Sequence, residues 1–552
     1  MDRRATIRNS PPGWNGAGEV MRTDVAILGG GLAGLTLSLQ LRQRFPDLGV
    51  VVLERRRHPV PEATHKVGES SVEIAAHYFE KVLGLKDHLA SRQLKKFGFR
   101  FFFSEGRRDI DSVLELGAST YLATPSYQID RGIFENFLGE RARESGVEFI
   151  DGVTVRAVDL ADGEGAHRVR CERDGAAVAI EARWIVDASG RAGILKRQLG
   201  LEQDNDHDVN SAWFRIGARI DVNEWSRATR WLQRCDPPDR WLSTNHLVGE
   251  GYWVWLIPLA SGSHSVGIVA DGRIHPLSRI NSFGRALQWL HEFQPRLADE
   301  LEAKRDLLQD FVFLKHFSYG CKKVFSGARW AITGEAGVFL DPFYSPGSDF
   351  IAIANTYITE LVAHDRAGHP VASYARIYEQ FFMSFCDSTM SLYRNQYRMF
   401  GDPEVLPVKV IWDYTYYWGV LCQLFFQQRL TDLTTLSRLR DELNGSKTLN
   451  YAMQDFLRHW SARSGRRNSP VLLDQAQLAW FAELNRGLRD ELGDEAFKVR
   501  MRRTAQQLRQ LAREIVAKAT VEHPGLDASP VLALLDGTPE EIPAGMLFDS
   551  AA

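Results

Sequence analysis

The pattern of apolar and polar positions divides the chain into three stretches of different secondary structure. Near the N-terminus, an apolar run at 25–28 is followed by glycines, a helical pattern to about Arg44, and a second apolar run at 50–53. This order predicts a βαβ unit. From about 95 to 330, β-branched and aromatic runs predict a mixed sheet, with one clear helix at Arg131 to Ser145. Beyond Gly347 the pattern is helical almost to residue 520.

Length and composition are those of a large globular protein. The chain has 552 residues, of which 44% are hydrophobic and 25% charged, with 67 Lys and Arg against 70 Asp and Glu. A net charge of −3 gives no electrostatic footprint for nucleic acid or acidic membranes. The most apolar uncharged run, 414–428, is shorter than the about 20 residues that a membrane helix needs. We therefore expect neither a membrane span nor a nucleic-acid partner.

Cysteine usage and the first residues favour a cytoplasmic protein. The five cysteines are odd in number and far apart, and none lies in a metal-binding spacing, so neither a disulfide framework nor a metal site is predicted. The N-terminus has no apolar signal-peptide core. We expect four segments: a mobile tail at 1–22, a cofactor and sheet module at 23–365, a helical region at 366–525, and a C-terminal tail at 526–552.

The glycines between the first strand and helix follow the pattern GxGxxG. Gly29 permits a tight turn, Gly31 lets the backbone approach a pyrophosphate, and Gly34 allows close helix packing. Ala33 lies in the same turn, where the helix N-terminus supplies amide donors for phosphate. Glu54 ends the second strand, twenty residues after Gly34, where an acid accepts hydrogen bonds from a ribose. The motif predicts a dinucleotide cofactor without choosing between FAD and NAD.

Two later segments choose between these cofactors. A strand at 184–187 runs into a turn, and a strand at 330–332 is followed by Gly334 and Glu335. Their order and spacing after the glycines resemble the FAD-binding monooxygenase superfamily, whose second acid holds the ribityl chain. The resemblance implies FAD, with Glu335 as a contact one methylene longer than the usual aspartate. Arg131 matches a family position near the cofactor; the alternative is an ordinary first-turn arginine.

Two further motifs resemble one branch of this superfamily, the flavin-dependent halogenases. Residues 253–258 match the pattern WxWxIP, and residues 339–347 match FxxPxxSxG. On a strand, Trp253, Trp255 and Ile257 share one face by their period of two. The resemblance implies that this face lines a tunnel between flavin and substrate, blocking the substrate while a small oxidant passes. Ordinary core packing is the alternative.

The resemblance also implies which residues handle the oxidant. Halogenases of this class use a lysine that holds or polarises hypohalous acid, and by position this lysine is Lys96. Burial and aromatic neighbours would lower its pKa and strengthen its donor contact. Lys95 is a competitor on the opposite face, and two solvated lysines at the start of a strand are the plain alternative. Ser345 is expected to position the oxidant or the flavin loop, and Pro342 to contact the cofactor.

The chain departs from the halogenase pattern on either side of the motif serine. Tryptophan halogenases have a glutamate where this chain has Tyr344, so a carboxylate is missing and a phenol or pyrrole is favoured over free tryptophan. Halide is thought to bind backbone amides after the serine, but Pro346 has no N–H, which leaves Gly347 as the expected contact. Lys66 is expected in a loop near the flavin, with Glu69 capping the following helix.

These expectations describe an α/β protein with a Rossmann-like, FAD-binding, monooxygenase-type fold, a mixed-sheet substrate region and a helical C-terminal region. The resemblance implies an FADH2-dependent halogenase, in which flavin hydroperoxide converts chloride or bromide to hypohalous acid that attacks a phenolic or pyrrolic substrate. A separate flavin reductase is expected, and the substrate is free or tethered to a carrier protein. A halide-independent aromatic monooxygenase or oxidase and a non-catalytic flavin-binding protein are the alternatives. The aromatic segment 408–428 is either a substrate lid or the core side of the helical region.

Overall fold

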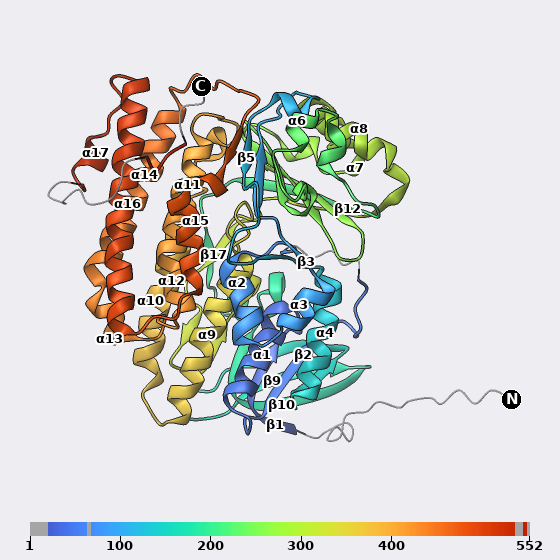
Figure 1. Ribbon diagram of the computed structural model, residues 1–552. Coiled ribbons are helices and arrows are strands. Elements are labelled where there is room, and N and C mark those ends of the chain that lie inside the picture. The colour runs from blue at the N-terminus through green and yellow to red at the C-terminus, as the bar shows by residue number, and fades with distance from the viewer. Residues whose placement is uncertain (1–19, 63–67, 536–544, 549–552) are drawn as a thin grey trace.

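The fold is that of a computed structural model, which describes residues 20–62, 68–535 and 545–548. Figure 1 shows the N-terminal elements in blue, the helices α6, α7 and α8 of the second sheet in green, and the orange and red C-terminal helices along one side of the molecule. The expected tail at 1–22 lies outside the described residues up to residue 19, and residues 20–22 already belong to the first strand.

The first sheet contains the predicted βαβ unit. Strands β1 and β2 are parallel neighbours joined by α1 (Leu32–Arg44), and Val25 to Leu28 of β1 are buried without alternation, as in a parallel strand covered on both faces. In spatial order the main path of the sheet is β18 (Phe325–Ser326), β19 (Trp330–Ile332), β10 (Ala176–Asp187), β1 (Val20–Leu28), β2 (Val50–Glu54) and β7 (Glu148–Asp151). An antiparallel extension next to β10 consists of β9 (His167–Arg173) and β8 (Val153–Asp159).

The second sheet is the predicted mixed sheet. Its order is β16 (Leu308–Leu314), β12 (Val209–Ile216), β15 (His264–Asp271), β14 (Tyr252–Pro258), β13 (Thr244–Gly249), β4 (Phe99–Phe102), β5 (Glu115–Gly117) and β20 (Leu472–Asp474). The β13–β4 and β5–β20 pairs are parallel, and the other neighbours are antiparallel. The edge strand β20 was missed by the sequence pattern, which predicted only helices in that part of the chain.

Strand β14 separates two hydrophobic cores. Trp253, Trp255 and Ile257 belong to the large core shared with the first sheet and the C-terminal helices. The alternate residues of the strand belong to a smaller core with α7 (Phe283–Phe293) and α8 (Pro295–Ala303). The period-two prediction for the motif strand is therefore correct, and it turns both tryptophans toward the interior between the sheets.

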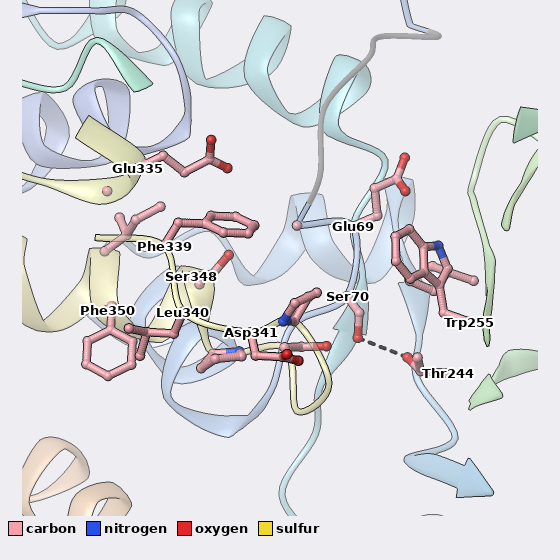
Figure 2. Close-up of a pocket in the computed structure, with 18 of the residues that line it drawn as sticks. Glu69, Ser70, Thr244, Trp255, Glu335, Phe339, Leu340, Asp341, Ser348 and Phe350 are labelled. Atoms are coloured by element: carbon pink, nitrogen blue, oxygen red, sulfur yellow. Dashed lines mark hydrogen bonds between the residues drawn. The ribbon is translucent and has the colours of Figure 1, made fainter. Parts of the chain in front are cut away.

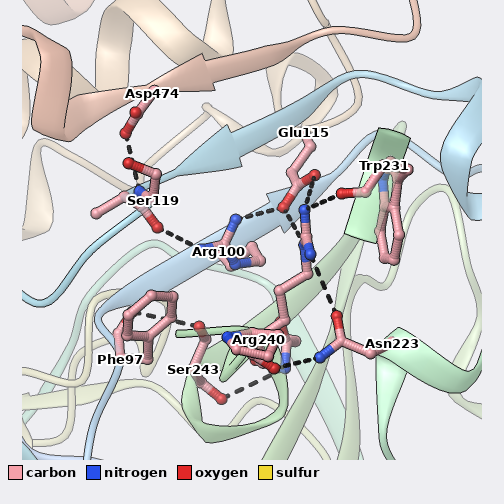
Figure 3. A network of polar contacts seen from close by, with 12 residues as sticks. Phe97, Arg100, Glu115, Ser119, Asn223, Trp231, Arg240, Ser243 and Asp474 are labelled. Carbon is pink, nitrogen blue, oxygen red and sulfur yellow. Dashed lines mark hydrogen bonds and ion pairs between the residues drawn. The ribbon is translucent and has the colours of Figure 1, made fainter. Parts of the chain in front are cut away.

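A buried network of charges holds β4, β5 and the segment before β13 together (Figure 3). The carboxylate of Glu115 pairs with Arg100 and with Arg240, whose Nε lies 2.7 Å from Oε1, and all three side chains are fully buried. The Arg240 guanidinium also lies 4.0 Å from the ring centre of Trp231. Removing one member of such a network would leave a buried charge without compensation.

The remaining elements surround these sheets. Two small antiparallel pairs join β3 (Leu94–Lys95) to β6 (Tyr127–Gln128) and β11 (Glu202–Asp204) to β17 (Tyr319–Cys321). The other helices of the first 330 residues include α2 (Glu73–His77), the π-helix η1 (Tyr78–Val82), α3 (Lys86–Arg92), α4 (Arg131–Glu144), α5 (Ile194–Gln198) and α6 (Thr229–Leu232). Helix α4 matches the helix predicted there.

The helical region begins at Gly347, inside the segment that was expected to end at residue 365. It includes α9 (Gly347–Arg366), α10 (Val371–Met390), α11 (Leu406–Tyr416), the π-helix η10 (Tyr417–Cys422), α12 (Gln423–Phe426), α13 (Leu433–Arg438), α14 (Arg440–Ser461), α15 (Ala479–Arg486), α16 (Asp494–Glu522) and α17 (Ser529–Leu532). The stretch expected as a C-terminal tail contains α17, and Val531 and Met546 are buried because they pack on the large core.

Candidate functional site

The glycine turn between β1 and α1 has the geometry that the motif predicts. Gly29 has a φ of +119°, and a Cβ on it would lie 2.2 Å from the Ala188 carbonyl oxygen. A Cβ on Gly34 would lie 2.0 Å from the Gly29 carbonyl oxygen, so the helix can approach the turn only without a side chain. A Cβ on Gly31 would meet no atom within 4 Å. The open space at Gly31 is where the motif predicts a pyrophosphate.

The acid at the end of β2 lies beside this turn. Glu54 Oε2 accepts a hydrogen bond of 2.7 Å from the Gly30 amide, and Oε1 accepts one from the Arg56 amide. On the other side, Ala33 contacts the second family segment, because a Cβ on Gly334 would lie 2.9 Å from the Ala33 Cβ. The open space at Gly31, the half-buried Glu54 and the start of α1 therefore fit the adenosine and diphosphate portion of FAD.

A first cavity continues from this end of the fold toward the second sheet (Figure 2). Expected cofactor residues Arg131, Glu335 and Pro342 all line it. Arg131 is paired with Glu135 at 2.6 Å, and Glu335 contributes to raising the pKa of Arg131, although burial lowers that pKa overall. The lining residues are Gly68, Glu69, Ser70, Arg131, Thr244, His246, Trp253, Trp255, Ile257, Gly334, Glu335, Val338, Phe339, Leu340, Asp341, Pro342, Ser345, Pro346, Gly347, Ser348, Phe350 and Ile351.

The tryptophan strand forms one wall of this first cavity. Trp253, Trp255 and Ile257 all line it, as the tunnel prediction requires, and each is nearly fully buried. The indole of Trp255 donates to Ser265 Oγ at 3.1 Å, and that of Trp253 donates to the Tyr397 hydroxyl at 3.1 Å. Both rings are thus fixed in orientation, and the wall between the sheets is rigid.

The second motif forms the opposite wall and the start of α9. Ser345 has a φ of +54°, a left-handed conformation that is uncommon outside glycine. It is one of the residues that line the first cavity. Pro346 is the N-cap of α9, and the helix begins at Gly347. The Phe350 amide donates to the Pro346 carbonyl, so the amides of Gly347 and Ser348 precede the first intrahelical bond. They are backbone donors at the edge of the first cavity.

Glu69 does not cap a helix, contrary to the sequence prediction. Its carboxylate is buried and accepts a hydrogen bond of 2.9 Å from Arg215 Nε in the second sheet. Helix α2 begins four residues later, with Val72 as its N-cap. Leaving a buried carboxylate without a cation costs more free energy than leaving a helix end without a side-chain cap, so Glu69 pairs with Arg215 instead. Lys66, also expected near the flavin, lies outside the described residues.

Lys96 is buried, whereas Lys95 is exposed on the other side of the segment, so the structure separates the two candidates. The ammonium of Lys96 donates to Ser70 Oγ at 2.9 Å and to the Ser71 carbonyl at 3.1 Å, and it lies 3.4 Å from the ring centre of Phe99. Burial lowers the pKa of Lys96 to about 7, although Glu73 and Asp349 oppose this shift. The lysine follows β3 in a connection rather than opening a strand.

A second cavity adjoins the first, and Pro346 and Phe350 line both. Seven of its fifteen lining residues are aromatic, and many of the fifteen come from α9, α10, α11 and η10. They are Val72, Phe99, Tyr344, Pro346, Asp349, Phe350, Ser388, Thr389, Leu392, Tyr393, Asp413, Tyr414, Tyr416, Tyr417 and Leu421. Part of the aromatic segment 408–428 therefore faces a cavity, while Trp412 and Trp418 of the same segment are buried in the large core.

Lys96 stands between the two cavities. Ser70, which accepts its hydrogen bond, lines the first cavity, and Phe99, which lies under its ammonium, lines the second. The Ser70 hydroxyl also shares a 2.9 Å hydrogen bond with Thr244, another residue of the first cavity (Figure 2). The ammonium therefore contacts one lining residue of each cavity.

Comparison with known proteins agrees with this geometry. Residues 22–260 match the family model described as an FAD binding domain. The protein is a flavoprotein. It is 25% identical over 473 residues to flavin-dependent halogenase chlA of Dictyostelium discoideum, which covers 78% of this chain and 77% of that protein.

Two other likenesses of this flavoprotein extend the comparison. It is 28% identical over 333 residues to the 1H-pyrrole-2-carbonyl-(peptidyl-carrier protein) chlorinase of Pseudomonas fluorescens, covering 59% of this chain and 72% of the chlorinase. The crystal structure of halogenase PltM in complex with phloroglucinol and FAD shares the fold, with a TM-score of 0.64, 18% identity, and coverage of 90% of this chain and 96% of that one. The predicted resemblance to flavin-dependent halogenases is confirmed, and the flavoprotein is an oxidoreductase.

Sequence reasoning missed the acidic side of the flavoprotein's second cavity. Asp349 and Asp413 line it, and Glu73 is buried close enough to Lys96 to oppose the lowering of its pKa. The only signal for Asp349 was its position two residues after the motif glycine.

Residues 20–62, 68–535 and 545–548 contain no group of three or more side chains suited to a metal ion, and no helix long and apolar enough to span a membrane.

Proposed function

We propose that the flavoprotein is an FADH2-dependent halogenase that acts on an electron-rich phenolic or pyrrolic substrate through hypohalous acid. The observation that carries the proposal is the position of Lys96, whose ammonium contacts one residue of each of two adjoining cavities. An enzyme that brings its substrate directly to the flavin needs one cavity for both. Two cavities with a buried cation between them suit a small oxidant made in one and used in the other.

The residues of the first cavity are suited to holding FAD and confining the oxidant. Gly29, Gly31 and Glu54 would hold the nucleotide portion, and Arg131 and Glu335 the portion nearer the ring. Reduced FAD, when bound, supplies the oxygen chemistry that converts halide to hypohalous acid. The Trp253 and Trp255 side chains block a ring-sized substrate from this cavity, while the hydroxyls of Ser70 and Thr244 offer a polar path to Lys96.

Halide is proposed to bind at the start of α9. The amides of Gly347 and Ser348 precede the first hydrogen bond of this 20-residue helix, where the positive end of the helix dipole favours an anion. Pro346 contributes no N–H, so one donor fewer faces the halide than a non-proline residue would provide. This supports weak halide affinity, and it is the observation that keeps a halide-independent aromatic monooxygenase or oxidase as the second candidate function.

Lys96 is proposed to direct the oxidant. An ammonium has three hydrogens, and among the described residues two are used by Ser70 and Ser71, which leaves one for the oxygen of hypohalous acid. Burial beside the Phe99 ring strengthens that hydrogen bond, because water does not compete for it. The halogen, polarised toward the second cavity, then meets a ring held among tyrosines and phenylalanines.

The remaining partners follow from the same reaction. A separate flavin reductase is proposed to supply FADH2. The aromatic second cavity suits a free phenol, and the pyrrolyl carrier-protein chlorinase among the relatives keeps a tethered pyrrole as the alternative. All five cysteines are free and buried, which favours a cytoplasmic location.

The test is product mass. Purified enzyme, FAD and a flavin reductase are incubated with phenols and pyrroles, free and carrier-bound, in chloride, bromide or halide-free buffer. We expect a chlorinated product in chloride, a brominated product in bromide, and no halogenated product in halide-free buffer. Hydroxylated product at equal rates in all three buffers would contradict it and favour the monooxygenase.

A further inference from the structure

Two carboxylates line the second cavity, although the position that carries one in tryptophan halogenases is Tyr344 here. Asp349 lies in the first turn of α9, and Asp413 lies in α11. Both side chains are about 2% exposed. If the substrate is a phenol, a carboxylate on this cavity can accept the proton that the phenol loses, so the contacts of each acid decide which of them is able to do so.

Asp413 is already neutralised by its neighbours. The Lys409 ammonium lies 2.8 Å from its Oδ2, and Gln454 donates to its Oδ1 at 2.7 Å. The hydroxyl of Tyr344 donates to Oδ2 at 2.8 Å. Burial raises the pKa of Asp413, but Lys409 and the two hydrogen-bond donors act against that shift and occupy its oxygens. Asp413 therefore serves to fix the Tyr344 ring at the cavity wall.

Asp349 has only neutral donors in contact with it. The Ala75 amide donates to Oδ1 at 2.9 Å, and the Tyr417 hydroxyl donates to Oδ2 at 2.6 Å. Within the part of the chain that the structure describes, no cation pairs with its carboxylate. Burial raises the pKa of Asp349 to about 8, and nearby Glu73 acts in the same direction while Lys96 acts against it. Asp349 therefore lacks the paired cation that opposes proton uptake at Asp413.

A second buried acid, Glu73, lies near Lys96 and Asp349. The Oε2 atom of Glu73 is buried and makes no hydrogen bond to the described residues, although Lys96 acts on its charge. Burial raises the pKa of Glu73 as well. The charge of Lys96 acts on two buried acids, Asp349 and Glu73. A proton taken up by one of them neutralises a buried negative charge and creates no new one.

We propose that Asp349 is a catalytic residue that accepts the hydroxyl proton of a phenolic substrate bound in the second cavity. The inference rests on the proposed function and goes beyond it by assigning the base. As the ring carbon forms its bond to halogen, the O–X bond of hypohalous acid breaks and its electrons leave with oxygen, which takes a proton from Lys96 to form water. The phenol O–H proton passes to Asp349, and the resulting dienone loses its ring proton to the now neutral Lys96 amine, which restores the ammonium. The halophenolate that forms takes its proton back from Asp349, so both side chains return to their starting states.

The test compares a phenol with its methyl ether in the wild type and in Asp349→Asn. The ether has no hydroxyl proton, so only the phenol benefits from the base. We expect the Asp349→Asn rate with the phenol to fall about 10²-fold or more, the usual contribution of general base catalysis. The rate with the ether should stay near that of the wild type, and the preference for the phenol should therefore collapse.

Tyr344→Phe is the matched control, because it removes a hydroxyl from the same cavity without touching Asp349. It should change both rates in the same proportion and keep the preference for the phenol. FAD binding and the thermal unfolding temperature verify that Asp349→Asn is folded. A folded variant that retains the wild-type preference would overturn the inference.

The outcome also separates the base from the proposed function. A collapsed preference with hydroxylated, halide-independent product would support Asp349 as the base and contradict the halogenase. A retained preference with halogenated product would contradict Asp349 as the base and support the halogenase.

Discussion

Replacing Lys96 by methionine removes the ammonium that stands between the two cavities. Methionine keeps most of the side-chain volume, and replacing a buried charge by an apolar side chain of similar size is often neutral for stability or stabilising. The fold and FAD binding should therefore survive, because the Lys96 side chain supplies no part of the glycine turn. What is lost is the hydrogen-bond donor that lies 2.9 Å from Ser70 and 3.4 Å from the Phe99 ring centre.

The magnitude follows from one charge-assisted hydrogen bond. Such a bond contributes about 1.5–3 kcal/mol, which is roughly a ten- to more than a hundredfold loss of rate if it acts on the transition state. Halogenated product is measured by mass spectrometry, and oxygen uptake is measured in the same reaction. We expect Lys96→Met to keep oxygen uptake within about twofold and to lose product by the factor above.

The exposed neighbour supplies the control. Lys95→Met removes a charge of the same kind on the other side of the segment, over the Tyr121 ring, and should leave product formation unchanged. Burial lowers the pKa of Lys96 to about 7 and raises that of Asp349 to about 8. Because the reaction needs Lys96 protonated and Asp349 ionised, the wild-type rate with a phenol should peak between these two pH values and fall on either side. Equal product from Lys96→Met and wild type, or a loss seen only in Lys95→Met, would refute the assignment.

Three further changes probe other parts of the account. Gly31→Val adds a side chain where a Cβ meets no protein atom, so the fold should hold while FAD titration shows no binding; wild-type affinity would contradict the glycine assignment. Pro346→Thr restores an amide at the start of α9 and should lower the KM for halide about tenfold or more, whereas an unchanged KM would place halide elsewhere. Glu115→Gln leaves two buried arginines without their carboxylate and should cost about 3–5 kcal/mol in denaturant unfolding; a loss below about 1 kcal/mol would contradict the network's role.

The sequence was sufficient wherever the chemistry is local. Glycine spacing located a tight turn between β1 and α1, and a period of two placed Trp253 and Trp255 on one face. The same period separated Lys96 from Lys95. These predictions succeed because each depends on the geometry of a single strand or turn, which a few neighbouring residues determine.

The sequence was insufficient wherever distant segments meet. Glu69 looked like a helix cap because its partner Arg215 lies 146 positions away. Strand β20 pairs with β5 across more than 350 residues, in a region whose pattern is otherwise helical. Asp349 and Asp413 look equivalent in sequence, and only the lysine in contact with one of them distinguishes the two. Their roles depend on packing between elements, which no local pattern records.

In the proposed reaction, hypohalous acid forms in the first cavity and reacts with the substrate in the second. The most direct test is a crystal structure of the enzyme with FAD, bromide and a phenolic substrate, with bromide located by its anomalous scattering. We expect bromide at the amides of Gly347 and Ser348 in the first cavity. We expect the phenol in the second cavity, with its hydroxyl at Asp349 and the Lys96 ammonium between phenol and bromide. A phenol stacked against the flavin in the first cavity would contradict it.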